Sequence, residues 1–81
     1  MSSEKKNLET IYSILDVYKS IIKGHTGGLK TFSEKLKMSE ATLWRRMESL
    51  RDLGAEIDYD NIQCTYYFVN NFSMVFEIKA R

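Results

Sequence analysis

The length and composition of the chain limit it to one small folded domain. Its 81 residues are 43% hydrophobic and 28% charged, which is the balance of a globular protein rather than of a disordered chain. No apolar run approaches the roughly 20 residues that a membrane-spanning helix needs, and the N-terminus lacks the order of a secretory signal. The single Cys64 can form no internal disulfide, and we interpret it as a small apolar residue on a strand. These features predict a cytoplasmic protein without a membrane partner.

The net charge of +1 is spread unevenly along the chain. Residues 1–30 carry five basic and three acidic side chains, residues 31–54 carry five and four, and residues 55–81 carry two and four. The first two thirds are therefore basic, and the last third is acidic. The difference matters for function, because a nucleic-acid backbone is attracted to positive potential and repelled by carboxylates.

Residues 4–23 have the spacing of a helix that packs in the core. Apolar side chains recur there at steps of three and four residues, and further apolar residues widen the stripe. The regular set is Leu8, Ile11, Leu15, Tyr18 and Ile22, and the widening set is Ile14, Val17 and Ile21. Gly24 ends this predicted helix, because the stretch "GHTGG" at 24–28 favours a turn. His25 lies in that turn, where we interpret it as a solvated residue or a helix-end cation rather than a metal ligand.

A short second helix is predicted over residues 32–37. Thr31 and Glu34 have the T-x-x-E spacing of a capping box, which marks the start of a helix. Phe32 and Leu36 would then face the core, together with Leu29 just ahead of the helix. A tight connection follows at residues 37–38.

A third helix is predicted over residues 40–53. Ser39 stands as its N-cap, and Gly54 stands where a helix end favours a left-handed backbone. The apolar positions between them are spaced four, three and three residues apart, which turns one face of the helix toward the core. They are Leu43, Met47, Leu50 and Leu53.

Beyond the third helix the pattern changes to the alternation of β-strands. We predict a hairpin over residues 55–69, in which acidic residues alternate with Ile57 and Tyr59 and the stretch "CTYYFV" is dense in strand-forming residues. Residues 60–63 supply its turn. The stretch "FSMVFEIK" at 72–79 alternates again and predicts a third strand, whose apolar face carries Phe72, Met74, Phe76 and Ile78.

The stretch "TFSEKLKMSEATLWRRMESLRDLGAEIDYD" at 31–60 resembles the winged helix-turn-helix of the biotin-repressor and DeoR-type bacterial transcriptional regulators. Ser39 matches the serine that caps the recognition helix of that family, and Gly54 matches the glycine before its wing. Thr42, Leu43 and Arg45 match the "T-[IV]-x-R" segment. The resemblance implies an α+β fold, a small winged helix-turn-helix with three helices followed by a β-hairpin wing, to which the pattern at 72–79 adds a third C-terminal strand. It also implies a bacterial or phage-type regulator that binds double-stranded DNA sequence-specifically.

A recognition helix that lies in the major groove presents the side chains of its first turns to base edges and phosphates. With Leu43 and Met47 turned inward, a step of about 100° per residue places Arg45 outward and puts Trp44 and Arg46 on opposite flanks. The predicted DNA-binding residues are Lys30, Lys37, Ser39, Ala41, Thr42, Trp44, Arg45 and Arg46, with Lys35 as a further phosphate partner.

The most prominent of these residues also have simpler interpretations. Arg45 could be solvated or paired with Glu48, and Arg46 could be a solvated cation. Trp44 could be a partly buried ring at the seam between the helix and the hairpin. The lysines could serve solubility alone, since exposed lysines are common on helices.

Two features of the sequence oppose tight binding by a single copy. Glu40 stands on the first turn of the predicted recognition helix, where it repels phosphate. Residues 55–72 contain no lysine or arginine, so the predicted wing is too acidic to hold the minor groove. We therefore expect a dimer, because two linked half-sites roughly add their binding free energies. The apolar surplus of the helix at 4–23 or the strand at 72–79 could form the contact, although the latter could instead join the domain's own sheet or cover the first helix.

The sequence predicts neither catalysis nor a cofactor, a metal site or a small-molecule site. It has one cysteine, one histidine and no glycine-rich phosphate loop after a strand. A ligand-sensing domain would not fit within this length, so we expect either a free-standing DNA-binding protein or the N-terminal piece of a longer one. The alternative function is a winged-helix module for protein–protein contact. Its docking surface would be the acidic hairpin with its aromatic residues Tyr59, Tyr66, Tyr67 and Phe68.

Overall fold

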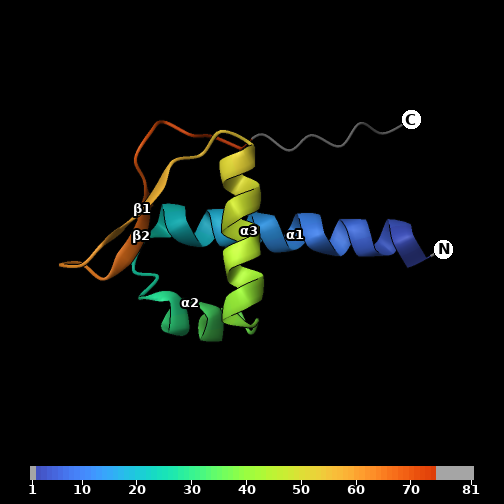
Figure 1. Ribbon diagram of the computed structural model, residues 1–81, viewed down its shortest axis with the longest axis horizontal. Coiled ribbons are helices and arrows are strands. Elements are labelled where there is room, and N and C mark those ends of the chain that lie inside the picture. Colours follow the sequence, from blue (N-terminus) through green and yellow to red (C-terminus); the bar gives the residue numbers. More distant parts are fainter. Residues whose placement is uncertain (1, 75–81) are drawn as a thin grey trace.

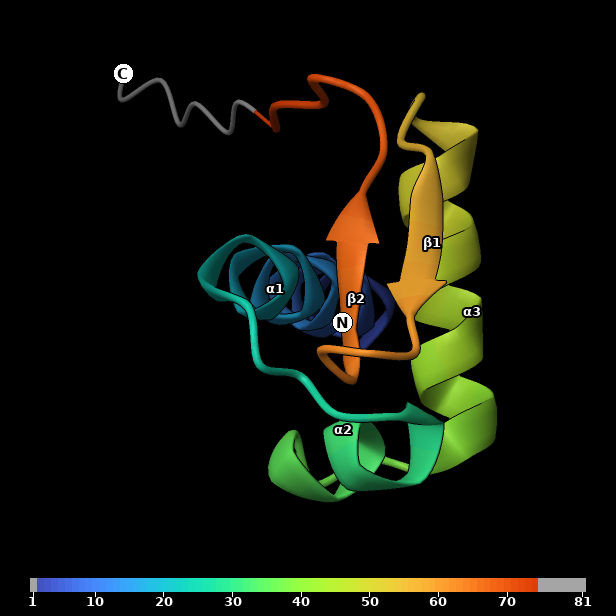
Figure 2. The ribbon, with the colours of Figure 1, turned by 90° about the vertical axis from the view of Figure 1, so that its left-hand side faces the viewer.

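The described part of the chain folds into three helices and one β-hairpin, an α+β arrangement. The computed structural model describes residues 2–74, with side chains from residue 8 onward. Its elements are α1 (Ser2–Lys23), α2 (Leu29–Lys35), α3 (Glu40–Asp52), β1 (Ile57–Asp60) and β2 (Thr65–Phe68). Helix α3 crosses α1, α2 lies at the start of α3, and the hairpin lies near the end of α1 (Figure 1). A view turned by 90° shows β2 on the side of α1 and β1 on the side of α3 (Figure 2).

The core lies where the three helices meet the hairpin. Val17 from α1, Phe32 from α2 and three residues of α3 are the largest fully buried side chains. The three from α3 are Leu43, Met47 and Leu50. Ile21, Ala55 and Ile57 complete the buried cluster. These residues hold α3 rigidly against the domain, because each of them contacts side chains from other elements.

Helix α1 confirms the prediction for residues 4–23, but it turns a different face to the core. Val17 and Ile21 are buried and Ile14 packs beside them, whereas Leu8 is 49% and Ile22 is 60% exposed. The prediction that the regular stripe is the core-facing one is therefore wrong for its two end residues. Two sets of apolar residues are present on this helix, and the regular set also reaches β2, because the Tyr18 ring packs against Phe68 with ring centroids 5.6 Å apart.

Helix α2 begins at Leu29, three residues earlier than predicted, and ends at Lys35. The predicted capping box is wrong, because Thr31 lies inside the helix and the N-cap is Gly28, which makes no side-chain cap. The Phe32 N–H donates to the Gly28 carbonyl at 2.8 Å, which closes the first turn. The earlier start lets Leu29 and Phe32, three residues apart on one helix face, both pack against the core.

Helix α3 begins as predicted, and its C-terminal end is closed by backbone hydrogen bonds. Gly54 has a φ of +112° and follows the helix, as its position predicted. The Gly54 N–H donates to the Arg51 carbonyl at 2.9 Å, and the Ala55 N–H donates to the Leu50 carbonyl at 3.0 Å, which together make a Schellman motif. Leu53, predicted as a core residue, is 58% exposed because it stands at the C-cap, where the chain turns and Ala55 enters the core instead.

The predicted hairpin is present as the antiparallel pair β1 and β2. Ile57 pairs with Phe68 and Asp60 pairs with Thr65, while the Asp60 carboxylate accepts hydrogen bonds from two backbone N–H groups of the turn. Cys64 was predicted to be a strand residue, but it is exposed and belongs to the turn. Its backbone has a φ of +54°, a conformation that closes the turn and does not fit a strand.

The described start of the predicted third strand is not in a strand. Residues 72–74 are irregular, and they lie against α1. The Phe72 ring meets Tyr18 edge-on with ring centroids 5.9 Å apart, and the Met74 N–H donates to the Tyr18 hydroxyl at 3.3 Å. Residues 75–79 of the predicted strand lie outside the described residues.

The linker between α1 and α2 is joined to β2 by two buried threonines. Thr26 is 2% and Thr65 is 8% exposed. The Thr26 N–H donates to the Thr65 hydroxyl at 3.0 Å, and the Tyr66 N–H donates to the Thr26 hydroxyl at 2.9 Å. His25, beside this pair, is exposed as expected, with a φ of +60°.

Candidate nucleic-acid interface

The outward face of α3 is set by the apolar residues on its inner face. Leu43, Met47 and Leu50 have no exposed surface, and helical geometry turns positions 41, 45, 48 and 52 the other way. The four residues at those positions are all exposed. They are Ala41, Arg45, Glu48 and Asp52. The orientation predicted for Arg45 from the sequence is therefore the one observed.

Ser39 and Thr42 organise the N-terminal turn of α3. The Ser39 hydroxyl accepts a hydrogen bond from the Thr42 N–H at 3.0 Å, as expected of an N-cap. The same hydroxyl donates to the Thr42 hydroxyl oxygen at 2.9 Å. Because its hydroxyl is engaged with Thr42 in both bonds, Ser39 has primarily a structural role. It holds the end of the helix and the free N–H groups there in position.

Replacing Ser39 by alanine should lower the free energy of unfolding by about 1 kcal/mol, because the Thr42 N–H loses its acceptor. Ser39→Asp should keep most of that stability, since a carboxylate also caps a helix and favours its positive end. Urea unfolding followed by circular dichroism measures both effects. Ser49→Ala is the matched control, because the Ser49 hydroxyl only donates to a carbonyl within the same helix. A loss as large for Ser49→Ala would contradict the capping role.

Arg45 is available for an external partner. Its exposed guanidinium makes no hydrogen bond or ion pair with the side chains of residues 8–74. The sequence left open an ion pair with Glu48, but Glu48 pairs with Arg51 on the next turn instead. The spacing along the helix does not decide between the two arginines, since both lie three residues from Glu48. Arg51 also donates to the Ile57 carbonyl at 3.3 Å, and this second contact favours its pairing with Glu48.

Trp44 and Arg46 lie on opposite flanks of α3, as helical geometry predicted. Arg46 Nε donates to the Ser13 hydroxyl on α1 at 3.0 Å, so its side chain bridges two helices. Trp44 is 48% exposed, and the Arg51 guanidinium carbon lies 5.4 Å from its ring centroid. Sequence reasoning missed Arg51, which connects Trp44, Glu48 and β1. The sequence signal that could have identified Arg51 is its position on the same helix face, three residues from Glu48 and seven residues from Trp44.

The predicted lysines lie on α2 and in the connection that leads to α3. Lys30 on the first turn of α2 and Lys37 in the connection are both exposed. Lys35 Nζ donates to the His25 carbonyl at 2.7 Å, so this ammonium is partly engaged within the domain. Glu40 is exposed on the first turn of α3, where its carboxylate opposes the positive potential of its neighbours.

The hairpin turns most of its aromatic side chains inward. The Tyr66 ring lies 5.9 Å from Phe32 and 4.9 Å from Tyr59, between ring centroids, and burial raises the pKa of the Tyr66 phenol. Phe68 packs against Tyr18 on α1. Tyr67 is the aromatic residue of β2 that remains exposed, at 41%. The exposed surface of the hairpin therefore combines the carboxylates of Glu56 and Asp58 with apolar Ile62 and Val69, which are 93% and 56% exposed.

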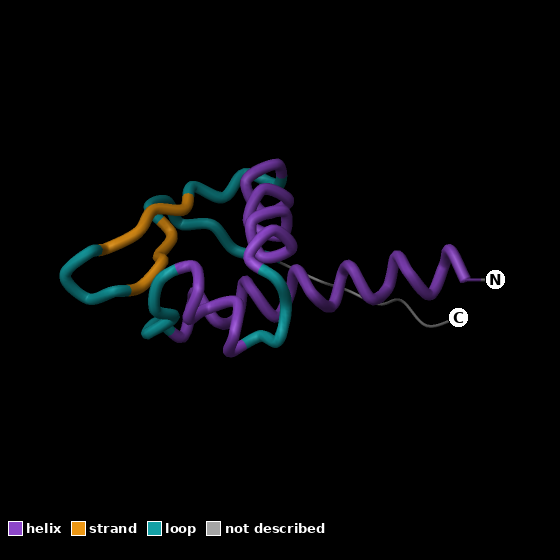
Figure 3. Tube along the Cα trace, turned by 60° about the horizontal axis from the view of Figure 1, so that its bottom comes forward, coloured by secondary structure: helices purple, strands orange, loops and turns teal. Residues whose placement is uncertain are grey.

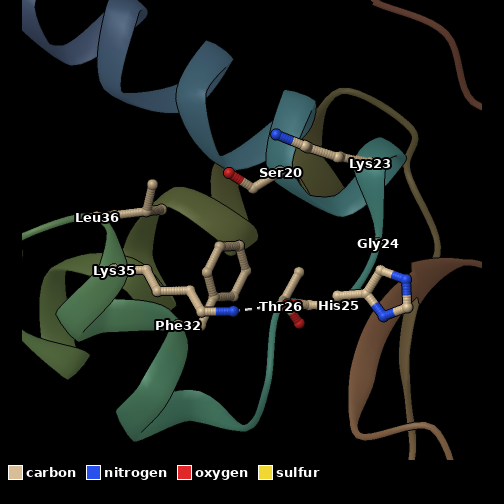
Figure 4. A pocket seen from close by; sticks show the side chains of 8 residues that line it. All are labelled: Ser20, Lys23, Gly24, His25, Thr26, Phe32, Lys35 and Leu36. Carbon is tan, nitrogen blue, oxygen red and sulfur yellow. Dashed lines mark hydrogen bonds between the residues drawn. The ribbon is translucent and has the colours of Figure 1, made fainter.

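An open cavity of about 380 Å³ lies between the end of α1 and α2 (Figure 4). Its lining combines polar and apolar side chains from both helices and the linker. They come from Ser20, Lys23, Gly24, His25, Thr26, Phe32, Lys35 and Leu36. Of the residues predicted to contact DNA, Lys35 lines the cavity and none of the residues of α3 does, so the cavity and the outward face of α3 are separate surfaces.

Further searches and comparisons add no other site. Among the described residues no three or more metal-binding side chains gather into a possible metal site. No helix in the described range is long and apolar enough to cross a membrane. No family model, curated protein or solved structure matches the chain. The features that bear on function are therefore those of α3 and its surroundings.

Proposed function

We propose that this protein binds double-stranded DNA as a cytoplasmic winged helix-turn-helix regulator of transcription, with α3 as the recognition helix. The observation that supports the proposal best is the state of Arg45, an exposed guanidinium on the outward face of a rigidly packed helix. Such a group can donate two hydrogen bonds to guanine O6 and N7, or it can bind a phosphate. The pairing of Glu48 with Arg51 leaves Arg45 without an acidic competitor on its own helix.

Phosphate contacts would come from the residues around the start of α3. Lys30 and Lys37 are exposed ammonium groups on the neighbouring helix and connection. The capped N-terminal turn offers backbone N–H groups to a phosphate, with Thr42 beside them. Trp44 can lie against a sugar-phosphate backbone, because nearly half of its surface is exposed. These contacts would fix the orientation of α3, while Arg45 reads the bases.

The hairpin in this proposal supports α3 and makes no contact with the minor groove. Glu56 and Asp58 are exposed, and their carboxylates repel phosphate. Glu40 weakens binding further at the start of α3. Binding by one copy is therefore expected to be weak and strongly dependent on salt.

Arg45→Ala should weaken binding to a short duplex by about 5- to 150-fold, since it removes a base or phosphate contact worth about 1–3 kcal/mol. Loss of a base contact should relax the sequence preference, whereas loss of a phosphate contact should lower the slope of log affinity against log salt by about one. Fluorescence anisotropy with a labelled duplex, titrated at low and moderate salt, measures both quantities.

Lys19→Gln is the matched control for the loss of one positive charge. Lys19 is exposed on α1, and its position between Val17 and Ile21 turns it away from the core and from α3. The affinity of the Lys19→Gln variant for the duplex should stay within about threefold of the wild-type value, since only a distant charge is lost. Absence of binding by the wild-type protein at low salt, or equal effects of the two substitutions, would refute the proposal.

The protein-interaction alternative has less support from the hairpin. Of the four aromatic residues that it requires, Tyr66 and Phe68 pack inward and Tyr59 is half-buried against Tyr66. Tyr67 alone among the four is classed as exposed. A docking surface on this hairpin would therefore use the Tyr67 ring together with the exposed Ile62 and Val69, rather than the four aromatic residues.

A further inference from the structure

The open cavity between α1 and α2 is a second candidate site in this domain. Figures 1 and 3 show α2 beside the last turns of α1, and the linker at residues 24–28 connects the two helices. Both helices pack against α3, and the cavity is the space between them. Its volume of about 380 Å³ falls at the lower end of the range for small-molecule sites, so it has room for one ring-sized ligand.

The inner wall of the cavity is apolar. The Phe32 ring lies at the centre of the lining, with Leu36 beside it (Figure 4). Phe32 is 1% exposed and also packs against Tyr66, so its ring is fixed in place. Leu36 in turn packs against the core cluster. A rigid wall of this kind favours a ligand with an apolar ring or a branched chain.

The lining of the cavity carries positive charge and no carboxylate. Lys23 comes from the last turn of α1 and Lys35 from the last turn of α2, and both are exposed. Their ammonium groups lie on either side of the Phe32 ring (Figure 4). Asp16 and Glu34, the acidic residues closest in sequence on the two helices, are exposed and do not line the cavity. The cavity therefore attracts anions.

The polar groups of the lining retain hydrogen-bonding capacity. The Lys23 ammonium makes no hydrogen bond or ion pair with the described residues, and Lys35 Nζ donates one of its hydrogens to the His25 carbonyl at 2.7 Å. The half-buried Ser20 hydroxyl also makes no hydrogen bond within the described range, whereas the Ser33 hydroxyl donates to a carbonyl of its own helix. These groups can donate to the oxygens of an anion.

The other two polar side chains of the lining are not available in the same way. The Thr26 hydroxyl already accepts from the Tyr66 N–H and donates to the Gly27 carbonyl. The His25 ring points away from Phe32 and Lys35 (Figure 4). The donors that face the cavity therefore come from α1 and α2.

We propose that this cavity binds a small organic anion, in which an acidic group is carried on an apolar ring or branched chain. The acidic group lies between the ammonium groups of Lys23 and Lys35, and the Ser20 hydroxyl donates to it. The apolar part covers the Phe32 ring. A small inorganic anion would leave this wall uncovered, and an organic cation would be repelled by the lysines. The ligand therefore needs both parts.

Benzoate is a suitable probe, because it joins a carboxylate to an aromatic ring. Titration of the full chain, followed by ¹H–¹⁵N NMR, should shift the backbone amides of residues 20–26 and 32–36. The shifts should saturate with a dissociation constant of about 1 mM, as expected of a ligand this small. Acetate lacks the ring, and benzylamine is a cation at neutral pH, so each should bind at least about tenfold more weakly. The test uses no DNA, so its outcome is independent of the proposed function.

Lys23→Gln should weaken benzoate binding at least about fivefold, because the acidic group loses one of its two charged partners. Lys23→Gln with Lys35→Gln should weaken it at least about 20-fold. Lys19→Gln is the matched control, since Lys19 is exposed one turn earlier on α1 and does not line the cavity. Its substitution should change the dissociation constant by less than about twofold at physiological salt. Circular dichroism checks that all three variants are folded.

Three results would overturn the inference. One is the absence of saturable shifts at the lining amides up to about 20 mM benzoate. Another is equal binding of benzoate and benzylamine, which would indicate an apolar cavity that does not select for charge. The third is an equal loss of affinity in the Lys23→Gln and Lys19→Gln variants, because general attraction to positive charge would then account for the binding.

Discussion

Leu50→Ala should lower the free energy of unfolding by about 2–5 kcal/mol, whereas Leu53→Ala should lower it by less than about 1 kcal/mol. The two leucines lie three residues apart near the end of α3, and their side chains are the same size. Leu50 has no exposed surface and packs in the core cluster, while 58% of the surface of Leu53 is exposed. The difference follows because truncation of Leu50 loses buried apolar contacts and leaves a cavity, and truncation of Leu53 leaves none.

Urea unfolding of the two variants side by side measures this difference. A domain of this size has a total stability of only about 5–10 kcal/mol, so Leu50→Ala should lower the urea midpoint to roughly half of the wild-type value. Leu53→Ala serves as the matched control for the loss of the same atoms from the same helix. Equal losses for both variants would show that Leu53 is covered in solution and that the two positions do not differ in burial.

Helix α3 could be predicted closely because independent local signals agree on it. Ser39 caps its start, Gly54 takes the positive φ at its end, and the apolar spacing places Leu43 and Met47 inward. The same geometry predicted that Arg45 faces outward, which is the basis of the candidate site. Where these signals stop, at Leu53, the prediction of burial failed, because spacing alone does not show where the chain turns away from the core.

Helix α1 illustrates what periodicity cannot decide. Its sequence carries two apolar faces, and both have helical spacing, so the pattern predicts the helix without showing which face meets α3. That choice depends on contacts between residues far apart in sequence, such as the hydrogen bond from Arg46 to Ser13. The row with the more regular spacing proved to be exposed at its two ends, Leu8 and Ile22, while Tyr18 within it packs against the core.

The start of α2 shows a local signal that tertiary packing overrode. Thr31 and Glu34 have the spacing of a capping box, but a cap at Thr31 would leave Leu29 outside the helix. Beginning the helix at Leu29 places it with Phe32 on the face that packs against the core. The apolar burial gained in this way outweighs the loss of one side-chain cap, which is worth about 1 kcal/mol.

The side-chain pairs around the candidate site could not be predicted for a related reason. Glu48 had two arginines at the same spacing, Arg45 before it and Arg51 after it. Only the structure shows that Arg51 also has the Ile57 carbonyl and the Trp44 ring within reach. These added partners favour the Arg51 pair, and they leave Arg45 open to solvent.

Thr65→Val should lower the free energy of unfolding by about 1–3 kcal/mol, although valine matches threonine in shape. The substitution removes the oxygen that accepts the Thr26 N–H at 3.0 Å, in a place where Thr26 is 2% exposed. That N–H would then be buried without a partner, which costs more than a missing hydrogen bond in water. The sequence predicted a solvated turn at the stretch "GHTGG". It did not indicate that Thr26 within this stretch anchors the linker to β2.

Thr65→Ser separates the hydrogen bond from the packing. Serine keeps the acceptor oxygen and loses one methyl group, so it should cost no more than about 1 kcal/mol. Both variants are compared by urea unfolding, and hydrogen exchange at the Thr26 amide reports the bond directly. Faster exchange is expected for Thr65→Val and little change for Thr65→Ser. If Thr65→Ser proved the more destabilising of the two, the methyl group rather than the hydrogen bond would hold the linker, because only packing distinguishes serine from threonine here.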